Sequence, residues 1–362
     1  MVSLHKTLLG NPLMLFHQSA RKLSGFILAV SLSCSLIGAE VTPALADALA
    51  NTPAKQAFGA MTLPSVSKPS SHGFYSKGCI AGAVALPVDG PNWQVMRLSR
   101  NRNWGHPVLI GLLEKLSRDG AKTGWPGLLV GDISQPRGGP MLTGHASHQV
   151  GLDADIWLTP MPNRRFTNRE RENVSAVSML KPNSLYVDQK KWTASRTALL
   201  KHAAGYPEVE RIFVHPGIKK QLCETVSGDR SWLAKVRPYW GHFYHFHVRI
   251  RCQAGSKDCK PQDPIGKDDG CGKSLDWWFT DEPWKPAKPA KPGEKPKPPK
   301  VMMVSQLPAA CATLLNAPNP ASVKDVTYGL GGSGIAIAPA PQAGADAPPV
   351  APAAIPLPAS KP

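Results

Sequence analysis

Five of the chain's eleven histidines fall in two short motifs whose residue types suit a metal ion. The first motif is GHASHQVGLDAD, from Gly144 to Asp155, and the second is HFYHFHVR, from His242 to Arg249. Histidine nitrogens and aspartate oxygens are ligands of catalytic Zn²⁺, which keeps one coordination position open for water. The chain has no G-x-S-x-G elbow, no P-loop and no H-E-x-x-H motif. Water activated by a metal is therefore the mechanism that the sequence favours.

The second motif lies in a predicted strand over residues 245–252. In a strand, alternate side chains point to opposite faces, so His245 and His247 share one face, with roughly 7 Å between their α-carbons. Phe246 and Val248 fall on the other face, where they would meet the core. Both imidazoles could therefore reach one site, one as a ligand and the other beside it.

In the first motif, Gly151 allows a tight turn that would bring His148 and Asp155 together. We predict that His148, Asp155 and His247 bind Zn²⁺ and leave its fourth tetrahedral position for water. For His145 three roles stay open: a further metal ligand, a hydrogen-bond partner or a turn residue.

Peptide hydrolysis also needs a base beside the water, and neither motif contains a glutamate. That base would be a histidine, His245 in the first place and His242 in the second. A purely structural zinc is the alternative, because a sequence cannot show an open coordination position.

The elements that must position these residues are helices mixed with strands. Apolar spacing predicts helices over residues 107–119 and 192–202, and strands over 128–133 and 209–215 as well as 245–252. This order predicts an α+β fold: one disulfide-linked domain in which a mainly antiparallel sheet carries the zinc site, flanked by helices and loops.

Composition divides the chain into five parts. We predict a signal peptide over residues 1–46, a zinc peptidase domain over 47–282, a Lys/Pro spacer over 283–300, a segment over 301–328 tied back through Cys311, and a disordered Ala/Pro-rich tail over 329–362. Alternating lysine and proline give an extended, stiff spacer, and a tail of Ala, Pro and Gly cannot bury a core.

The amino terminus has the layout of a secretory signal. Arg21 and Lys22 precede an apolar run over residues 23–39, followed by two A-x-A cleavage candidates. The run is short for a membrane span, and no later segment is apolar enough to be one. We therefore expect an exported chain without a membrane span in its mature form. Its six remaining cysteines predict three disulfides, with fifteen pairings open.

The formal net charge of +17 favours an acidic partner. Basic and aromatic residues are not interleaved as in proteins that bind single-stranded nucleic acid, so we expect no nucleic-acid partner. An exported protein of this charge would meet anionic polymers of the cell envelope.

The H-x₆-D motif from His148 to Asp155, followed by H-x-H from His245 to His247, resembles the LAS zinc peptidases. More closely, the chain resembles the penicillin-insensitive murein endopeptidases. The matching runs are GHPVLI at Gly105, GHASHQVGLDADIW at Gly144, RIFVHPGIKKQLC at Arg211, VRPYWGHFYHFHVRIRC at Val236 and DGCG at Asp269. The resemblance implies a periplasmic Zn²⁺ hydrolase that cuts the D-alanyl–diaminopimelyl cross-link of peptidoglycan.

The resemblance also implies individual roles. His148, Asp155 and His247 match the family's zinc ligands, His245 and His242 its active-site histidines, and His145 a further histidine near the metal. It implies the disulfides Cys79–Cys311, Cys223–Cys271 and Cys252–Cys259. Some family members bind a second zinc at a dimer interface through an Asp and a His, but residues 178–188 contain no histidine. The sequence therefore leaves open both a second zinc and a homodimer.

Two alternatives remain at this stage. A zinc D,D-carboxypeptidase or dipeptidase would use the same chemistry to trim stem peptides. A non-catalytic wall-binding protein would use zinc only to stabilise its fold.

Overall fold

The computed structural model describes residues 48–266, 268–286 and 300–329. Within them, seven strands form a sheet in the order β10-β9-β11-β8-β7-β5-β4, and β1-β2 and β3-β6 form two small sheets. The strands are β1 Ser70–Phe74, β2 Lys77–Ala81, β3 Val84–Ala85, β4 Asp89–Gly90, β5 Trp93–Val95, β6 Trp104–Gly105, β7 Leu128–Val130, β8 Asp153–Trp157, β9 Val209–Val214, β10 Val236–Pro238 and β11 His245–Ile250. In the large sheet β10–β9 and β5–β7 are parallel, and the other neighbours are antiparallel.

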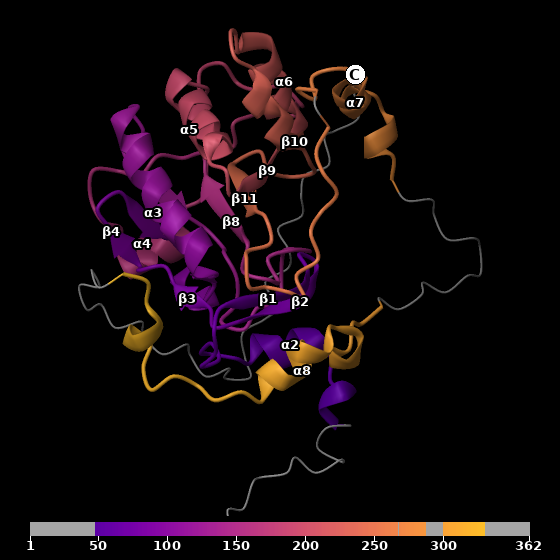
Figure 1. Cartoon of the computed structure of the whole chain (residues 1–362). Coiled ribbons are helices and arrows are strands. Elements are labelled where there is room, and N and C mark those ends of the chain that lie inside the picture. Colours follow the sequence, from indigo (N-terminus) through magenta and orange to yellow (C-terminus); the bar gives the residue numbers. More distant parts are fainter. Residues whose placement is uncertain (1–47, 267, 287–299, 330–362) are drawn as a thin grey trace, which may run out of the picture. The chain divides into compact units, whose positions relative to one another are not determined.

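Helices cover this sheet (Figure 1). The α-helices are α2 Ala54–Gly59, α3 Pro107–Lys122, α4 Asn168–Asn173, α5 Ala194–Gly205, α6 Pro216–Thr225, α7 Lys273–Asp276 and α8 Ala309–Leu315; the 3₁₀ turns are η1 Leu98–Arg100, η2 Ser231–Lys235, η3 Trp277–Phe279, η4 Glu282–Trp284, η5 Val304–Gln306 and η6 Lys324–Val326. Helix α3 begins at Pro107, a position whose N–H would have no partner within the helix, so proline loses no hydrogen bond there. The His106 side chain accepts a hydrogen bond from the Val108 N–H. The predicted α+β fold with a mainly antiparallel sheet is confirmed.

The two central strands divide their side chains between the core and a polar face. Ala154 and Ile156 of β8 join Phe246 and Val248 of β11 in the main hydrophobic cluster, which includes leucines of α3 and α5. Apart from Trp157 at the end of β8, the alternate residues of both strands are acidic, basic or histidine, and they are buried too. The predicted facing of β11 is therefore confirmed, and one side of the sheet is left free to carry chemistry.

All three predicted strands are shorter than expected. Strand β9 ends at Val214 rather than at residue 215, because His215 caps helix α6. Strand β7 ends at Val130 rather than at residue 133, because the backbone then turns away and the Ile133 N–H donates to the Arg102 carbonyl. Strand β11 ends at Ile250 rather than at Cys252, because Cys252 starts a loop that closes on Cys259 through a disulfide.

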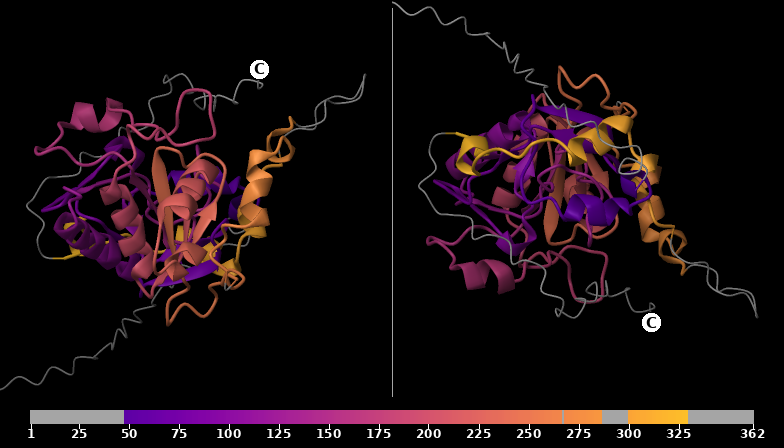
Figure 2. Two further views of the ribbon diagram at one scale, coloured as in Figure 1. Left: turned by 90° about the horizontal axis from the view of Figure 1, so that it is seen from above. Right: turned by 90° about the horizontal axis from the view of Figure 1, so that it is seen from below.

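Residues 300–329 pack against the start of the domain, and we call them the C-terminal strap. Cys311 of α8 is bonded to Cys79 of β2, and the two lie in a second apolar cluster with Phe58 of α2 and Leu314. Figure 2 shows the strap, in yellow, running close to the indigo residues of α2. Together with Cys223–Cys271 and Cys252–Cys259, this bond confirms all three implied disulfides.

Several predictions lie outside the described residues: the signal peptide over 1–46, spacer residues 287–299 and the tail from residue 330. In the described ranges, no helix combines the length and the apolar character that crossing a bilayer requires.

Candidate metal centre

Strand pairing brings the two histidine motifs together. Strand β11 runs antiparallel to β8 in a register that places His247 opposite Asp155 and Arg249 opposite Asp153. Since these side chains leave the sheet on its polar face, residues more than ninety positions apart in the sequence meet at one point.

His148 reaches this point from the loop before β8. Its backbone is left-handed, with φ +67°, and Gly151 has φ +69°, a conformation that favours glycine. The His148 N–H donates to Asp153 Oδ2 at 3.0 Å, which fixes the loop against the strand. The predicted turn at Gly151 is confirmed.

Three atoms face one another at the centre of the site. His148 Nε2 lies 3.2 Å from His247 Nδ1, and Asp155 Oδ1 lies 3.4 Å from each of these nitrogens. Donor atoms around a tetrahedral zinc with bonds of about 2.0–2.1 Å lie roughly 3.3 Å apart. The three atoms therefore have the mutual spacing of zinc ligands.

Hydrogen bonds orient both rings so that one nitrogen of each points toward the centre. His148 Nδ1 donates to the Ile133 carbonyl at 2.6 Å, and His247 Nε2 donates to Asp153 Oδ1 at 2.9 Å. Burial lowers the pKa of His247 to about 4, so its ring is neutral at pH 7. The facing nitrogen of His247 then carries a lone pair, which is the state that binds a metal. Although burial opposes it, the Asp155 carboxylate raises the pKa of His148, so a cation at the centre would take the place of the proton on its Nε2.

Asp155 supplies the charge that a cation requires. Burial alone would raise the pKa of Asp155, but the surrounding histidines, His245 foremost, hold it well below its usual range. Its Oδ1 is buried without a hydrogen-bond partner among the described residues. A buried anionic oxygen that has no hydrogen-bond partner and lies between two ring nitrogens fits a metal-binding site, in which an ion would contact all three atoms.

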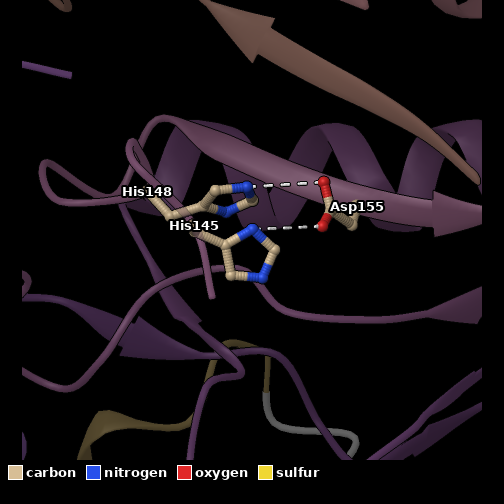
Figure 3. A group of neighbouring side chains, drawn as sticks. All are labelled: His145, His148 and Asp155. Atoms are coloured by element: carbon tan, nitrogen blue, oxygen red, sulfur yellow. Dashed lines mark ion pairs between the residues drawn. The ribbon is translucent and has the colours of Figure 1, made fainter. Parts of the chain in front are cut away.

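His145 occupies the opposite side of the Asp155 carboxylate (Figure 3). Its Nδ1 lies 3.6 Å from Asp155 Oδ2, and its Nε2 bonds to Asp132 Oδ2 at 2.8 Å. His145, His148 and Asp155 thus form a second group of three that could hold a metal, with ligand atoms within 4.8 Å of one another. The set with His247 is the tighter one, so His145 lies at the edge of the site.

His245 and His242 flank the same carboxylate. His245 Nε2 lies 3.5 Å from Asp155 Oδ2, and burial lowers the pKa of His245 to about 3. The ring centroids of His242 and His245 are 4.8 Å apart, and His242 Nδ1 donates to the Trp240 carbonyl at 2.5 Å. All six predicted residues therefore converge on one site.

Two buried carboxylates of the site are missing from the sequence predictions. Asp153 is fully buried and accepts hydrogen bonds from His247 and from Arg249 Nε, the latter at 2.7 Å. Asp132 is buried beside His145 and two arginines. Asp153 could have been found, since it shares a strand face with Asp155 two residues away; nothing in the local pattern around Asp132 points to it.

A cavity of about 330 Å³ opens beside the centre. Its lining includes Asp155, His145, His245, Tyr244 and Arg100. A substrate in this cavity would touch the edge of the centre that carries His245, on the Asp155 Oδ2 side.

Comparison with known proteins places the chain in a family. Residues 71–316 match the family described as penicillin-insensitive murein endopeptidase. Proteins of that name are similar to the chain: one from Haemophilus influenzae is 44% identical over 70% of this chain and 84% of its own, and one from Klebsiella pneumoniae is 43% identical over 67% and 86%. One from Pectobacterium atrosepticum is 40% identical over 72% of this chain and 88% of its own. By descent as well as by the site it builds, the chain belongs to the penicillin-insensitive murein endopeptidase family.

Proposed function

We propose that this protein is a periplasmic, zinc-dependent murein endopeptidase that hydrolyses D-alanyl–meso-diaminopimelyl cross-links of peptidoglycan. The observation that carries the proposal is the triangle of His148 Nε2, Asp155 Oδ1 and His247 Nδ1, with sides of 3.2, 3.4 and 3.4 Å. The family's name and the adjoining cavity support hydrolysis of a cross-link over a purely structural metal.

These three residues would hold the zinc, with His145 at the edge of the site. A zinc ion bound there would supply Lewis acidity and lower the pKa of a bound water to ~7. Burial keeps the His245 ring unprotonated at neutral pH, so it can accept the proton of the attacking water. His242 lies next to it with Nδ1 tied to the Trp240 carbonyl, which leaves Nε2 as the second proton acceptor.

Two features support a periplasmic location. Three disulfides form and persist in an oxidising compartment. The signal-like sequence over residues 1–46 provides for export. The charge of +17 suits an anionic wall polymer as the substrate.

Digestion of purified peptidoglycan tests the proposed reaction. We expect the protein to convert dimeric muropeptides to monomers, to lose this activity in a zinc chelator, and to regain it with added Zn²⁺ but not Mg²⁺, which prefers octahedral oxygen ligands. Chromatography of the digest measures the conversion. Shortening of monomers with dimers left intact would identify a D,D-carboxypeptidase or dipeptidase instead. Metal binding without any cleavage would identify a wall-binding protein.

Asp153 is expected to tune the zinc affinity without touching the metal. Replacing it with asparagine removes the charge that orients His247 and pairs with the buried Arg249. We expect zinc affinity to fall by ~10–100-fold, and the free energy of unfolding to fall by about 3 kcal/mol. Competition with a chromogenic chelator and urea denaturation measure the two effects. Asp258→Asn is the control, since the Asp258 side chain is exposed and bonded only to His72 among the described residues. Unchanged affinity in Asp153→Asn would contradict the role.

A further inference from the structure

A strained turn fixes one wall of the cavity. The 3₁₀ turn η1, Leu98–Arg100, is flanked by Arg97 with φ +59° and Asn101 with φ +50°. Left-handed backbone is uncommon outside glycine, and it persists where the surroundings hold it. Here the Asn101 side chain accepts a hydrogen bond from Trp104 Nε1 at 2.7 Å. The turn is therefore a rigid support for Arg100 at its end.

Arg100 extends from this turn into the cavity beside the metal centre. Its side chain is 46% exposed and lines the cavity with His145, Asp155 and His245. One of its nitrogens, Nη1, bonds to Asp132 Oδ2 at 3.1 Å, and that is the one hydrogen bond of the side chain within the described part of the protein. A guanidinium has five N–H donors, so most of those of Arg100 are available to a ligand.

The charge of Arg100 is not needed to neutralise Asp132. Arg102, which is buried, already bonds to the same Asp132 oxygen at 2.8 Å, and His145 bonds to it as well. The other arginine of the cavity, Arg97, is occupied, since its guanidinium donates to the carbonyls of Arg171 in α4 and of Val174 just after that helix. Arg100 is thus the cation of the cavity whose charge no other group requires, and it can bind an anionic group of a ligand.

The substrate of the proposed function carries such an anion at a fixed place. In a D-alanyl–diaminopimelyl cross-link, the carbon that bears the scissile nitrogen also bears a free carboxylate. An arginine recognises a carboxylate through two parallel N–H···O bonds. We propose that Arg100 binds this carboxylate of the leaving residue and so selects bonds in which it is free. This inference rests on the proposed function.

The consequence is a distinction between cross-links and ordinary peptide bonds. Inside a polypeptide the corresponding carboxyl group is consumed in the next amide, so it carries no charge and gives Arg100 no partner. A terminal D-Ala-D-Ala bond has the free carboxylate, so the selection holds for trimming substrates too. Arg100 would therefore recognise the free carboxylate next to the leaving amine, both in cross-links and in stem-peptide ends.

A pair of substrates tests the assignment. Cross-linked muropeptide dimers are prepared with this carboxylate free or converted to the carboxamide, which has the same shape and no charge. For the unmodified protein we expect kcat/KM to be ~10–100-fold higher on the free acid, the range of a hydrogen bond between charged groups. Arg100→Ala should lose that preference by falling on the free acid alone, and Arg100→Lys should keep part of it. Arg118→Ala, an exposed arginine paired with Glu114 on α3, is the control.

The amide substrate separates recognition from positioning. Because Arg100 also touches Asp132, which bonds to His145, its loss could disturb the centre itself. That effect would lower turnover of both substrates equally and change the zinc content, and this result would overturn the proposal. Equal turnover of the two substrates by the unmodified protein would overturn it as well.

Binding of the reaction product gives a readout without turnover. Calorimetry with the monomeric muropeptide, as free acid and as amide, should show the same preference in the unmodified protein and none in Arg100→Ala. If the unmodified protein cleaves neither dimer, the proposed function is wrong, and these binding data alone decide whether Arg100 recognises the carboxylate.

Discussion

His148→Ala will lose both bound zinc and hydrolysis of cross-linked muropeptides. His148 Nε2 lies 3.2 Å from His247 Nδ1 and 3.4 Å from Asp155 Oδ1, so its removal leaves two of the three closely spaced donors. We expect zinc content to fall from about one ion per chain to near zero, since a preformed donor set is what binds the metal, and dimer cleavage to fall to background. Metal analysis of the purified protein and muropeptide chromatography measure the two losses.

Circular dichroism must show that this variant still folds, because a buried ring is removed. His202→Ala is the matched control: His202 lies on α5, is only partly buried and is not one of the residues that make up the centre or its cavity. Retention of a full equivalent of zinc by a folded His148→Ala protein would refute the ligand assignment.

His245→Ala will keep its zinc and lose catalysis. His245 lines the cavity with Nε2 3.5 Å from Asp155 Oδ2, but it is outside the tight triangle of donors. Loss of a general base costs ~10²–10⁴-fold in kcat, and we expect a decrease in that range with unchanged metal content. Steady-state kinetics on a purified muropeptide dimer and metal analysis give the two numbers.

His72→Ala provides the comparison, since His72 lies on β1 and pairs with the exposed Asp258. Full activity of His245→Ala would remove the base assignment and pass it to His242. Loss of zinc together with activity would instead make His245 a part of the metal site.

Local pattern was enough to predict the parts of the site that a single segment determines. The alternation of β11 placed His245 and His247 on one face and Phe246 on the other, as the structure confirms. Likewise Gly151 predicted the turn that carries His148 toward Asp155. In both cases backbone geometry within a few residues decides where the side chains point.

The remaining features depend on contacts between distant segments, which a local pattern does not contain. The register that sets His247 opposite Asp155 also makes Asp153 the partner of Arg249, and neither pairing is visible until β8 and β11 lie side by side. Asp132 enters the site only because the chain leaves the sheet after β7. The roles of these carboxylates therefore had to come from the tertiary structure.

The C-terminal strap has a consequence for the order in which the molecule matures. Cys79 cannot form its disulfide until Cys311, 232 residues further along the chain, has been synthesised. Phe58 likewise becomes buried only when the same segment packs over it. Since a chain emerges from its amino end and domains fold as units, the region around Phe58 and Cys79 stays exposed until the strap has been synthesised. A thiol and an apolar surface are thus unprotected until that point. Formation of the Cys79–Cys311 disulfide and packing of the strap end this period.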